Sequence, residues 1–239
     1  MYYSGKQALF ENRNDAGRQL AEQLGEYEGQ STVVLAIPNG GVPVGLEVAL
    51  AIQAVLDLVI SRKLPLPLAP EAGFGAVGDD GTVIFNEELV NRYALTQQQI
   101  DYQIIRVREE IRQRKQLYQK DNPPTVASGK TVIITDDGLA SGFTMLATVA
   151  TVRRRRPKEI VVAVPASSAA ALEQVEKVAD KVVTLATGSM PRFAVADYYQ
   201  HWYDLSDNEV LQCLREWRMR HLKLNIELPQ DNNQADKRS

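Results

Sequence analysis

Residues 130–145 decide the fold, and they read Lys130-Thr-Val-Ile-Ile-Thr-Asp-Asp-Gly-Leu-Ala-Ser-Gly-Phe-Thr-Met145. Val132 to Ile134 form an apolar run that is too short for a helix and too uniform for a strand with one polar face. Such a run is typical of a strand in a parallel sheet that is covered by helices on both faces. The stretch therefore predicts a strand, a short polar turn and the beginning of a helix.

Two carboxylates, Asp136 and Asp137, end this strand, and small residues follow them. Small residues let backbone N–H groups approach a ligand, and Ser141 and Thr144 add hydroxyl groups where the next helix begins. The turn therefore predicts an anion-binding site. A sugar phosphate satisfies both parts, with its phosphate on residues 138–144 and its hydroxyls, alone or with Mg²⁺, against the carboxylates. The alternative is an ordinary turn whose aspartates only cap the helix.

Strands and helices alternate along the rest of the chain. The patterns predict further strands at 32–37, 56–60, 159–164 and 181–185, and helices at 15–27, 46–55, 97–119, 145–156, 169–178 and 206–217. Such alternation predicts an α/β fold of three layers, in which helices cover both faces of a mainly parallel sheet with right-handed crossovers.

A second glycine-containing turn, Pro38-Asn-Gly-Gly41, follows the strand predicted at 32–37. Gly40 and Gly41 allow positive φ and the close approach of an anion, so this turn is a second candidate anion site. A tight turn without a ligand is the alternative.

The segment between the third strand and the central strand departs from the alternation. Residues 64–73 are rich in Pro and Ala and predict a loop, and residues 74–77 and 82–85 predict a β-hairpin. Thr96 and Gln99 form a capping box for the helix at 97–119, whose mixed charges indicate a solvated or subunit-facing helix.

The composition excludes several classes of protein. With 239 residues, 44% of them hydrophobic, the chain is long enough for one domain but short for two. A net charge of −3 argues against a nucleic-acid binder, so the run Arg153 to Arg156 indicates a solvated helix end. No apolar run approaches the length of a membrane span. The single cysteine and the polar N-terminus lead us to expect a cytoplasmic protein.

Residues 132–144 resemble the fingerprint of the type I phosphoribosyltransferases, an apolar strand, an acidic pair and a small-residue loop. The matching residues are Asp136, Asp137, Gly138, Leu139, Ala140, Ser141, Gly142 and Thr144. The resemblance implies an enzyme that binds 5-phosphoribosyl 1-diphosphate with Mg²⁺ and transfers the phosphoribosyl group to a nitrogen nucleophile, as a nucleobase provides. Asp136 and Asp137 would hold the ribose hydroxyls, and the metal indirectly through them, and Asp137 would accept a proton from the acceptor.

The same resemblance assigns the turn at 38–41 to the diphosphate. A similar group of predicted phosphoribosyltransferases has Pro-Arg-Gly-Gly at this turn. This chain keeps the two glycines, Gly40 and Gly41, but has Asn39 where that group has arginine. The turn therefore lacks the bidentate phosphate donor that the arginine would provide. Arg62 and Lys63, at the end of the third strand, would neutralise the leaving diphosphate, or else they are solvated.

The length predicts one domain, placed at 1–228, and the polar composition predicts a disordered tail at 229–239. Within the domain, the resemblance implies a flexible loop, hairpin and long-helix insertion at about 64–120 and a C-terminal hood over the acceptor at about 187–205. The hood aromatics either stack on a base or form a small core, and they are Phe193, Tyr198, Tyr199, Trp202 and Tyr203. A homo-oligomer is expected, without nucleic-acid or membrane partners.

Two other functions are consistent with the sequence. One is a non-catalytic protein that binds the phosphoribosyl donor as a sensor, which the missing arginine at Asn39 favours. The other is a hydrolase or phosphorylase of a ribosyl phosphate. No motif in the sequence identifies the acceptor.

Overall fold

A computed structural model describes residues 8–119, 125–189 and 193–227 of the chain. Its centre is a five-stranded sheet in the order β2-β1-β6-β7-β8, and all neighbouring strands in it are parallel. The strands are β1 (Thr32–Ala36), β2 (Val55–Leu58), β6 (Thr131–Thr135), β7 (Glu159–Ser168) and β8 (Lys181–Gly188). The predicted α/β fold with a mainly parallel sheet is confirmed.

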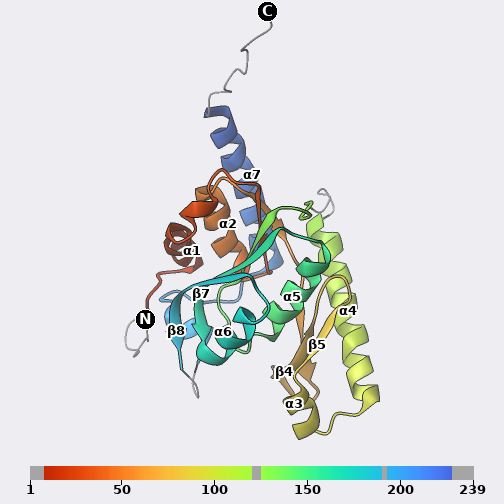
Figure 1. Cartoon of the computed structure of the whole chain (residues 1–239). Helices are drawn as coiled ribbons and strands as arrows, with labels where there is room; N and C mark the ends of the chain where they lie inside the picture. The colour runs from red at the N-terminus through yellow and green to blue at the C-terminus, as the bar shows by residue number, and fades with distance from the viewer. Residues whose placement is uncertain (1–7, 120–124, 190–192, 228–239) are drawn as a thin grey trace, which may run out of the picture.

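Two layers of helices cover the sheet, because successive side chains of each strand point to opposite faces (Figure 1). Val34 and Ile133 pack with one layer, and Val33 and Ile134 pack with the other. The first layer contains α1 (Arg13–Glu22), α2 (Gly41–Ala51) and α7 (Asp207–Glu227), and the second contains α5 (Phe143–Arg154) and α6 (Ala169–Glu176).

A smaller antiparallel sheet lies beside α5. It has the order β3-β4-β5 and carries two further helices, and the elements are β3 (Arg62–Leu66), β4 (Ala69–Val77), β5 (Val83–Phe85), α3 (Glu87–Arg92) and α4 (Gln97–Gln119). The predicted hairpin is confirmed, but the loop predicted at 64–73 is wrong. Leu64 and Leu66 are buried in the core, and Pro65 stands at a register shift, where a missing N–H group is tolerated.

The ends of several helices differ from the prediction. α2 begins at Gly41 rather than at residue 46, because a proline, here Pro43, is tolerated in the first turn of a helix. The helix predicted at 15–27 ends in a separate 3₁₀ turn, Gly25–Tyr27, and another such turn spans Val195–Tyr198. α7 continues well beyond the predicted end at residue 217.

The arginine run at 153–156 is not simply a solvated helix end. Arg155 donates to both carboxylate oxygens of Asp79, at 2.8 and 2.9 Å, and Arg154 lies 3.5 Å from Asp80. Both aspartates belong to the turn between β4 and β5. The end of α5 is therefore tied to the smaller sheet by ion pairs.

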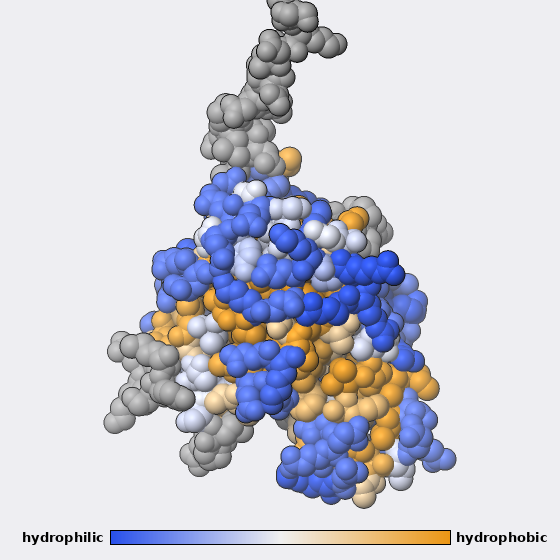
Figure 2. All heavy atoms as spheres, in the orientation of Figure 1, coloured by the Kyte–Doolittle hydropathy of each residue, from blue (hydrophilic) through white to orange (hydrophobic). Residues whose placement is uncertain are grey.

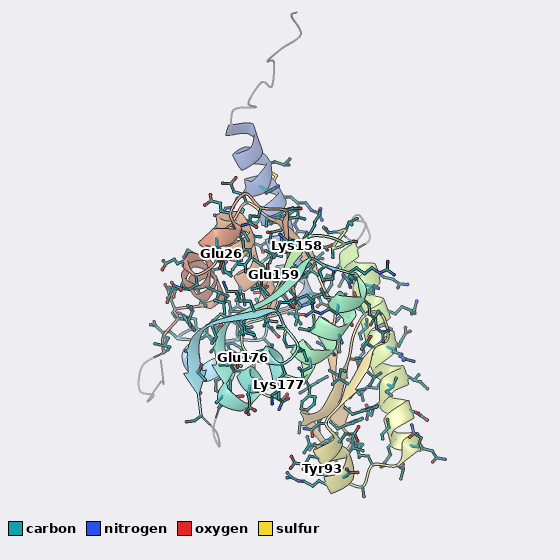
Figure 3. The ribbon with its side chains drawn as sticks, viewed as in Figure 1. Glu26, Tyr93, Lys158, Glu159, Glu176 and Lys177 are labelled. Atoms are coloured by element: carbon teal, nitrogen blue, oxygen red, sulfur yellow. The ribbon has the colours of Figure 1, made fainter. Side chains whose placement is uncertain are left out.

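Charged side chains such as those of Lys158, Glu176 and Lys177 are exposed and point outward (Figure 3). Figure 2 shows hydrophobic surface around β5 and the neighbouring parts of α4 and α5, and all three residues of β5 are half-buried. Within the described ranges, no helix combines the length and the apolar character that crossing a membrane requires.

Candidate active site

The loop between β6 and α5 lies at the carboxyl edge of the main sheet and is held in place by β7. Leu139 donates its N–H to the Ala166 carbonyl at 2.9 Å, and Ser168 donates its N–H back to the Leu139 carbonyl at 2.9 Å. The Ser168 hydroxyl donates to the Ala140 carbonyl at 2.7 Å and accepts from the Ala171 N–H. These bonds fix the loop before any ligand arrives.

The loop ends in an open helix N-terminus. Gly142 is the N-cap of α5, has a φ of 80° and provides no capping side chain. The first N–H groups of a helix have no acceptor within the helix, and they form the positive end of its dipole. An anion is therefore favoured at this turn, beside the hydroxyls of Ser141 and Thr144.

A cavity of about 420 Å³ brings most of the predicted site residues together. The loop after β6 forms one wall, and β3, β4 and the start of α3 form the opposite wall. The lining residues are Lys63, Ala72, Gly73, Gly75, Asn86, Leu89, Asp136, Gly138, Leu139, Ala140, Ser141, Gly142, Phe143, Thr144, Met145 and Val195. The cavity thus holds a cation, a carboxylate and a helix N-terminus.

The two adjacent aspartates have different surroundings. Asp136 lines the cavity, and its Oδ1 accepts a hydrogen bond from the Asp137 N–H at 2.9 Å. Burial, and then the neighbouring Asp137 charge, raise the pKa of Asp136 well above its usual range. Asp137 does not line the cavity, because its Oδ2 binds Arg13. Burial raises the pKa of Asp137, while the charge of Arg13 acts in the opposite direction.

Arg13 is a site residue that the sequence analysis did not find. Its Nε donates to Asp137 Oδ2 at 2.8 Å and its Nη1 donates to the Tyr203 carbonyl at 2.9 Å. The guanidinium carbon lies 3.9 Å from the ring centroid of Trp202, which is within the range of a cation–π interaction. The Tyr199 hydroxyl donates to the Asp137 carbonyl at 2.7 Å. The second aspartate is therefore held by α1 and by the segment after β8.

The turn at 38–41 packs directly on the acidic pair. A Cβ atom on Gly40 would lie 1.9 Å from Asp137 Oδ2, and one on Gly41 would lie 2.6 Å from the Thr135 carbonyl oxygen, so neither position accepts a side chain. Asn39 does not line the cavity. Its Nδ2 donates to the Leu205 carbonyl at 2.6 Å, which ties the turn to the segment before α7.

Arg62 and Lys63 do not face the same space. Successive side chains of a strand point to opposite sides, and β3 presents Lys63 to the cavity and Arg62 to α4. The nearest carboxylate oxygen to the Arg62 guanidinium is Glu110 Oε2, at 4.0 Å. The structure therefore brings only Lys63 to the cavity wall.

The aromatic residues after β8 largely form a small core. Tyr198 and Tyr199 are 4% and 5% exposed and cluster with Phe10, and Phe193 and Trp202 pack against this cluster. Of the two alternatives for Tyr198 and Tyr199, the structure favours the core. Within the described ranges, Phe143 is the aromatic residue that lines the cavity.

Comparison with known proteins points to one family. A model of the family described as "Phosphoribosyl transferase domain" matches residues 79–201, just over half of the chain. Two curated proteins of Mycobacterium tuberculosis, from strains CDC 1551 and H37Rv, are named "Putative phosphoribosyl transferase MT0597" and "Putative phosphoribosyl transferase Rv0571c". Each is 37% identical over 206 residues, which cover 86% of this chain and 46% of the relative. The chain thus spans about half the length of the curated relatives it matches.

Among solved structures, the crystal structure of TT1426 from Thermus thermophilus is 35% identical, with a TM-score of 0.71. The similarity covers 87% of this chain and 98% of TT1426. It therefore extends over nearly the whole fold described above and is not confined to the loop after β6. The chain belongs to the phosphoribosyl transferase family.

Proposed function

We propose that this protein transfers the phosphoribosyl group of 5-phosphoribosyl 1-diphosphate to a nitrogen nucleophile and releases diphosphate. The observation that carries the proposal is the cavity of about 420 Å³ in which the loop 138–144 meets Asp136 and Lys63. An anion subsite at one place and a carboxylate at another suit a sugar that bears a phosphate. The volume lies within the range of about 300–1,000 Å³ that is usual for small-molecule sites.

Each group has a distinct proposed role. The first turn of α5, with Ser141 and Thr144, binds the 5′-phosphate, and Asp136 accepts hydrogen bonds from the ribose hydroxyls. As diphosphate leaves with the bonding electron pair, positive charge develops at the anomeric carbon, and a preorganised carboxylate stabilises it. Asp137 lies directly next to Asp136, with Oδ2 bound to Arg13 and outside the cavity lining, and an acceptor that reaches past Asp136 is proposed to give Asp137 the proton that its nitrogen loses.

The acidic pair fits an indirect role in binding Mg²⁺. Within the described ranges, no group of three or more His, Cys, Asp or Glu side chains is arranged to hold a metal ion. Mg²⁺ commonly keeps several waters and binds one or two carboxylates together with substrate phosphates. Asp136 and Asp137 would hold the ion through the substrate hydroxyls, and the ion would neutralise charge on the leaving diphosphate.

The proposal also covers the acceptor, the oligomeric state and the cellular compartment. A nucleobase is the proposed acceptor, and a homo-oligomeric assembly in the cytoplasm is the proposed state of the protein. The cavity offers Asn86, Leu89 and Val195 as well as Asp136, so polar and apolar contacts are available to an acceptor. The lone cysteine, Cys213, is a free thiol, as is usual in a reducing compartment.

Diphosphate release tests the proposal. The protein is incubated with 5-phosphoribosyl 1-diphosphate, Mg²⁺ and each of a panel of nucleobases, and diphosphate and nucleotide are measured. Release that depends on one base supports transfer. Donor binding in calorimetry without release for any base would favour the sensor, which the side-chain orientation of Asn39 keeps as the second candidate. Ribose phosphate formed from nucleosides and inorganic phosphate would instead indicate a phosphorylase, and ribose phosphate formed from nucleotides and water would indicate a hydrolase.

A further inference from the structure

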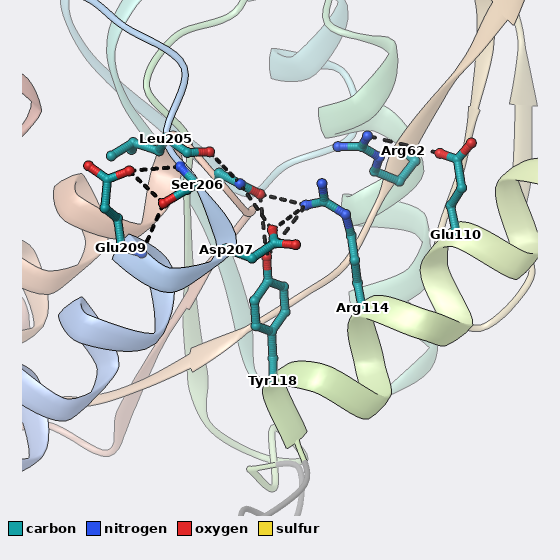
Figure 4. Close-up of polar contacts among 9 residues, drawn as sticks. Arg62, Glu110, Arg114, Tyr118, Leu205, Ser206, Asp207 and Glu209 are labelled. Atoms are coloured by element: carbon teal, nitrogen blue, oxygen red, sulfur yellow. Dashed lines mark hydrogen bonds and ion pairs between the residues drawn. The ribbon is translucent and has the colours of Figure 1, made fainter.

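Two arginines from different elements, Arg62 and Arg114, lie close to one another (Figure 4), and Arg114 contacts Asn39 beyond the carboxyl end of β1. Arg62 belongs to β3 and Arg114 to α4. Burial, and then the charge of Arg114, lower the pKa of Arg62. Within the described ranges, the Arg62 guanidinium makes no hydrogen bond, and its ion pair with Glu110 spans 4.0 Å. Glu110 is shared, because its Oε1 accepts from Arg106 at 3.3 Å.

The carboxylate beside Arg114 is also shared. Arg114 Nη1 lies 3.5 Å from Asp207 Oδ1, the same oxygen that accepts from the Tyr118 hydroxyl at 2.5 Å and from Asn39 Nδ2 at 3.2 Å. Asp207 Oδ1 therefore accepts hydrogen bonds from two neutral donors in addition to its ion pair with Arg114. The charge of Arg114 disfavours the charged form of Arg62, and an added anion would relieve this repulsion.

The pair lies between two segments of the proposed donor site. Arg114 Nη1 donates to Asn39 Oδ1 at 2.5 Å, and the next residue, Gly40, packs on Asp137. On the other side, Arg62 directly precedes Lys63, which lines the cavity. Ligands of open α/β sheets bind at this edge, beyond the carboxyl ends of the strands.

A neighbouring hydroxyl also lacks a partner. Ser61 is 2% exposed, and its Oγ has no hydrogen-bond partner within the described ranges. Buried hydroxyls usually have one, because an unpaired polar group is costly. Ser61 immediately precedes Arg62, so a hydroxyl without a hydrogen-bond partner is adjacent in the chain to a guanidinium group whose ion pair spans 4.0 Å.

We propose that Arg62 and Arg114 bind the diphosphate that leaves in the proposed reaction. In this arrangement α4 supplies through Arg114 the guanidinium group that the turn at 38–41 lacks, and Asn39 orients it. The inference rests on the proposed function, but it concerns a subsite separate from the 5′-phosphate site on α5. The ligand class is a diphosphate or another compact polyanion.

Calorimetry with two separate probes, inorganic diphosphate and ribose 5-phosphate, tests the assignment on the full chain. Arg114→Gln and Arg62→Gln should each weaken diphosphate binding about tenfold or more, because each removes charged hydrogen bonds. Ribose 5-phosphate affinity should stay within about twofold. Arg62→Gln loses no hydrogen bond within the described ranges, so this variant should fold even if Arg114→Gln does not.

Two control variants separate direct binding from loop support. Arg112→Gln removes an exposed arginine of the same helix that pairs with Glu109, and it should leave both affinities unchanged. Tyr118→Phe removes the hydrogen bond to Asp207 but no charge, so it should affect diphosphate much less than Arg114→Gln does.

The results discriminate between the two proposals. Unchanged diphosphate affinity in folded Arg62→Gln and Arg114→Gln proteins would overturn the assignment, as would an equal loss in Tyr118→Phe. Wild-type protein that binds ribose 5-phosphate but not diphosphate would also overturn it and leave the 5′-phosphate site intact. Wild-type protein that binds neither probe would refute the proposed function itself.

Discussion

Arg13 Nε lies 2.8 Å from Asp137 Oδ2, although the two residues are 124 positions apart in the chain. Their side chains are only 7% and 16% exposed, so the pair is shielded from solvent. The ion pair fixes the direction of the Asp137 carboxylate. It also connects α1 to the acidic end of the central strand.

Replacing Arg13 should destabilise the protein. Arg13→Gln leaves the Asp137 carboxylate buried without its cation, and breaking a buried pair from one side typically costs about 3–5 kcal/mol. Unfolding in urea measures this loss. A double-mutant cycle with Asp137→Asn is the control, because the double variant should lose less than the sum of the two single losses. Additive losses would mean that the pair is not coupled.

The Asp136 carboxylate should lower the stability of the folded protein although the proposed reaction needs it. Its carboxyl has a raised pKa because burial and the neighbouring Asp137 charge oppose ionisation. Asp136→Asn keeps the shape and removes that charge, so the folded protein should become more stable at neutral pH. Turnover should fall by about 10²-fold or more, since the stabilising carboxylate is lost. Melting temperature and diphosphate release, measured on the same protein, test both expectations.

The pH dependence of this effect has a definite sign. When the folded pKa of an acid exceeds its unfolded value, here 3.8, the folded state binds more protons and the free energy of unfolding falls as pH rises between the two values. The advantage of Asp136→Asn over wild type should therefore grow from about pH 4 upward and level off above the folded pKa. An advantage that shrinks with rising pH would contradict this assignment.

Local signals explain which elements the sequence predicts well. The capping box of Thr96 and Gln99 forms as predicted, with Thr96 N–H donating to Gln99 Oε1 at 2.9 Å, and the helix that it begins has the predicted ends. β3 was missed because Pro65 interrupts the run of strand-forming residues. Its burial depends on β4 and α4, which are elements that no local pattern connects to it.

The same distinction holds for the site. Asp136, Lys63 and the loop 138–144 line one cavity, and the sequence could group them because strand ends in a parallel sheet meet at one edge. Arg13 and Arg114 were missed because each meets its partner through tertiary packing alone. Arg13 shares a helix face with Ala16 and Leu20, and a cation on an apolar face was the available signal.

The Arg155–Asp79 pair should stabilise the junction between α5 and the smaller sheet. The Asp79 side chain is only 5% exposed and accepts two hydrogen bonds from Arg155. Arg155→Ala should cost about 3 kcal/mol, because it removes the cation that donates to both oxygens of a buried carboxylate and leaves, within the described ranges, only Lys115 beside it, at 4.0 Å. Arg156→Ala removes an exposed side chain of the same run and should stay within about 0.5 kcal/mol. Equal losses in urea unfolding would show that the buried pair contributes nothing specific.

A bulky residue at 142 is a poor test of phosphate binding. Gly142 has a φ of 80°, and a Cβ atom there would lie 3.2 Å from the Ala171 Cβ atom. Gly142→Leu should therefore lower stability through backbone strain, whether or not a phosphate binds at the loop. Loss of affinity in that variant would not separate a phosphate site from a simple helix cap.

Ser141→Ala provides the sharper test. Ser141 is exposed and lines the cavity, so removing its hydroxyl should leave the melting temperature unchanged. If the hydroxyl donates to the 5′-phosphate, affinity for ribose 5-phosphate should fall by about 1.5–3 kcal/mol, the usual range for a hydrogen bond to a charged group. Ser128→Ala, an exposed serine before β6 at the other end of the strand, is the matched control and should bind normally. If Ser141→Ala binds as tightly as the control, its hydroxyl does not contact the phosphate. Should the wild type itself fail to bind ribose 5-phosphate, the loop is only a helix cap.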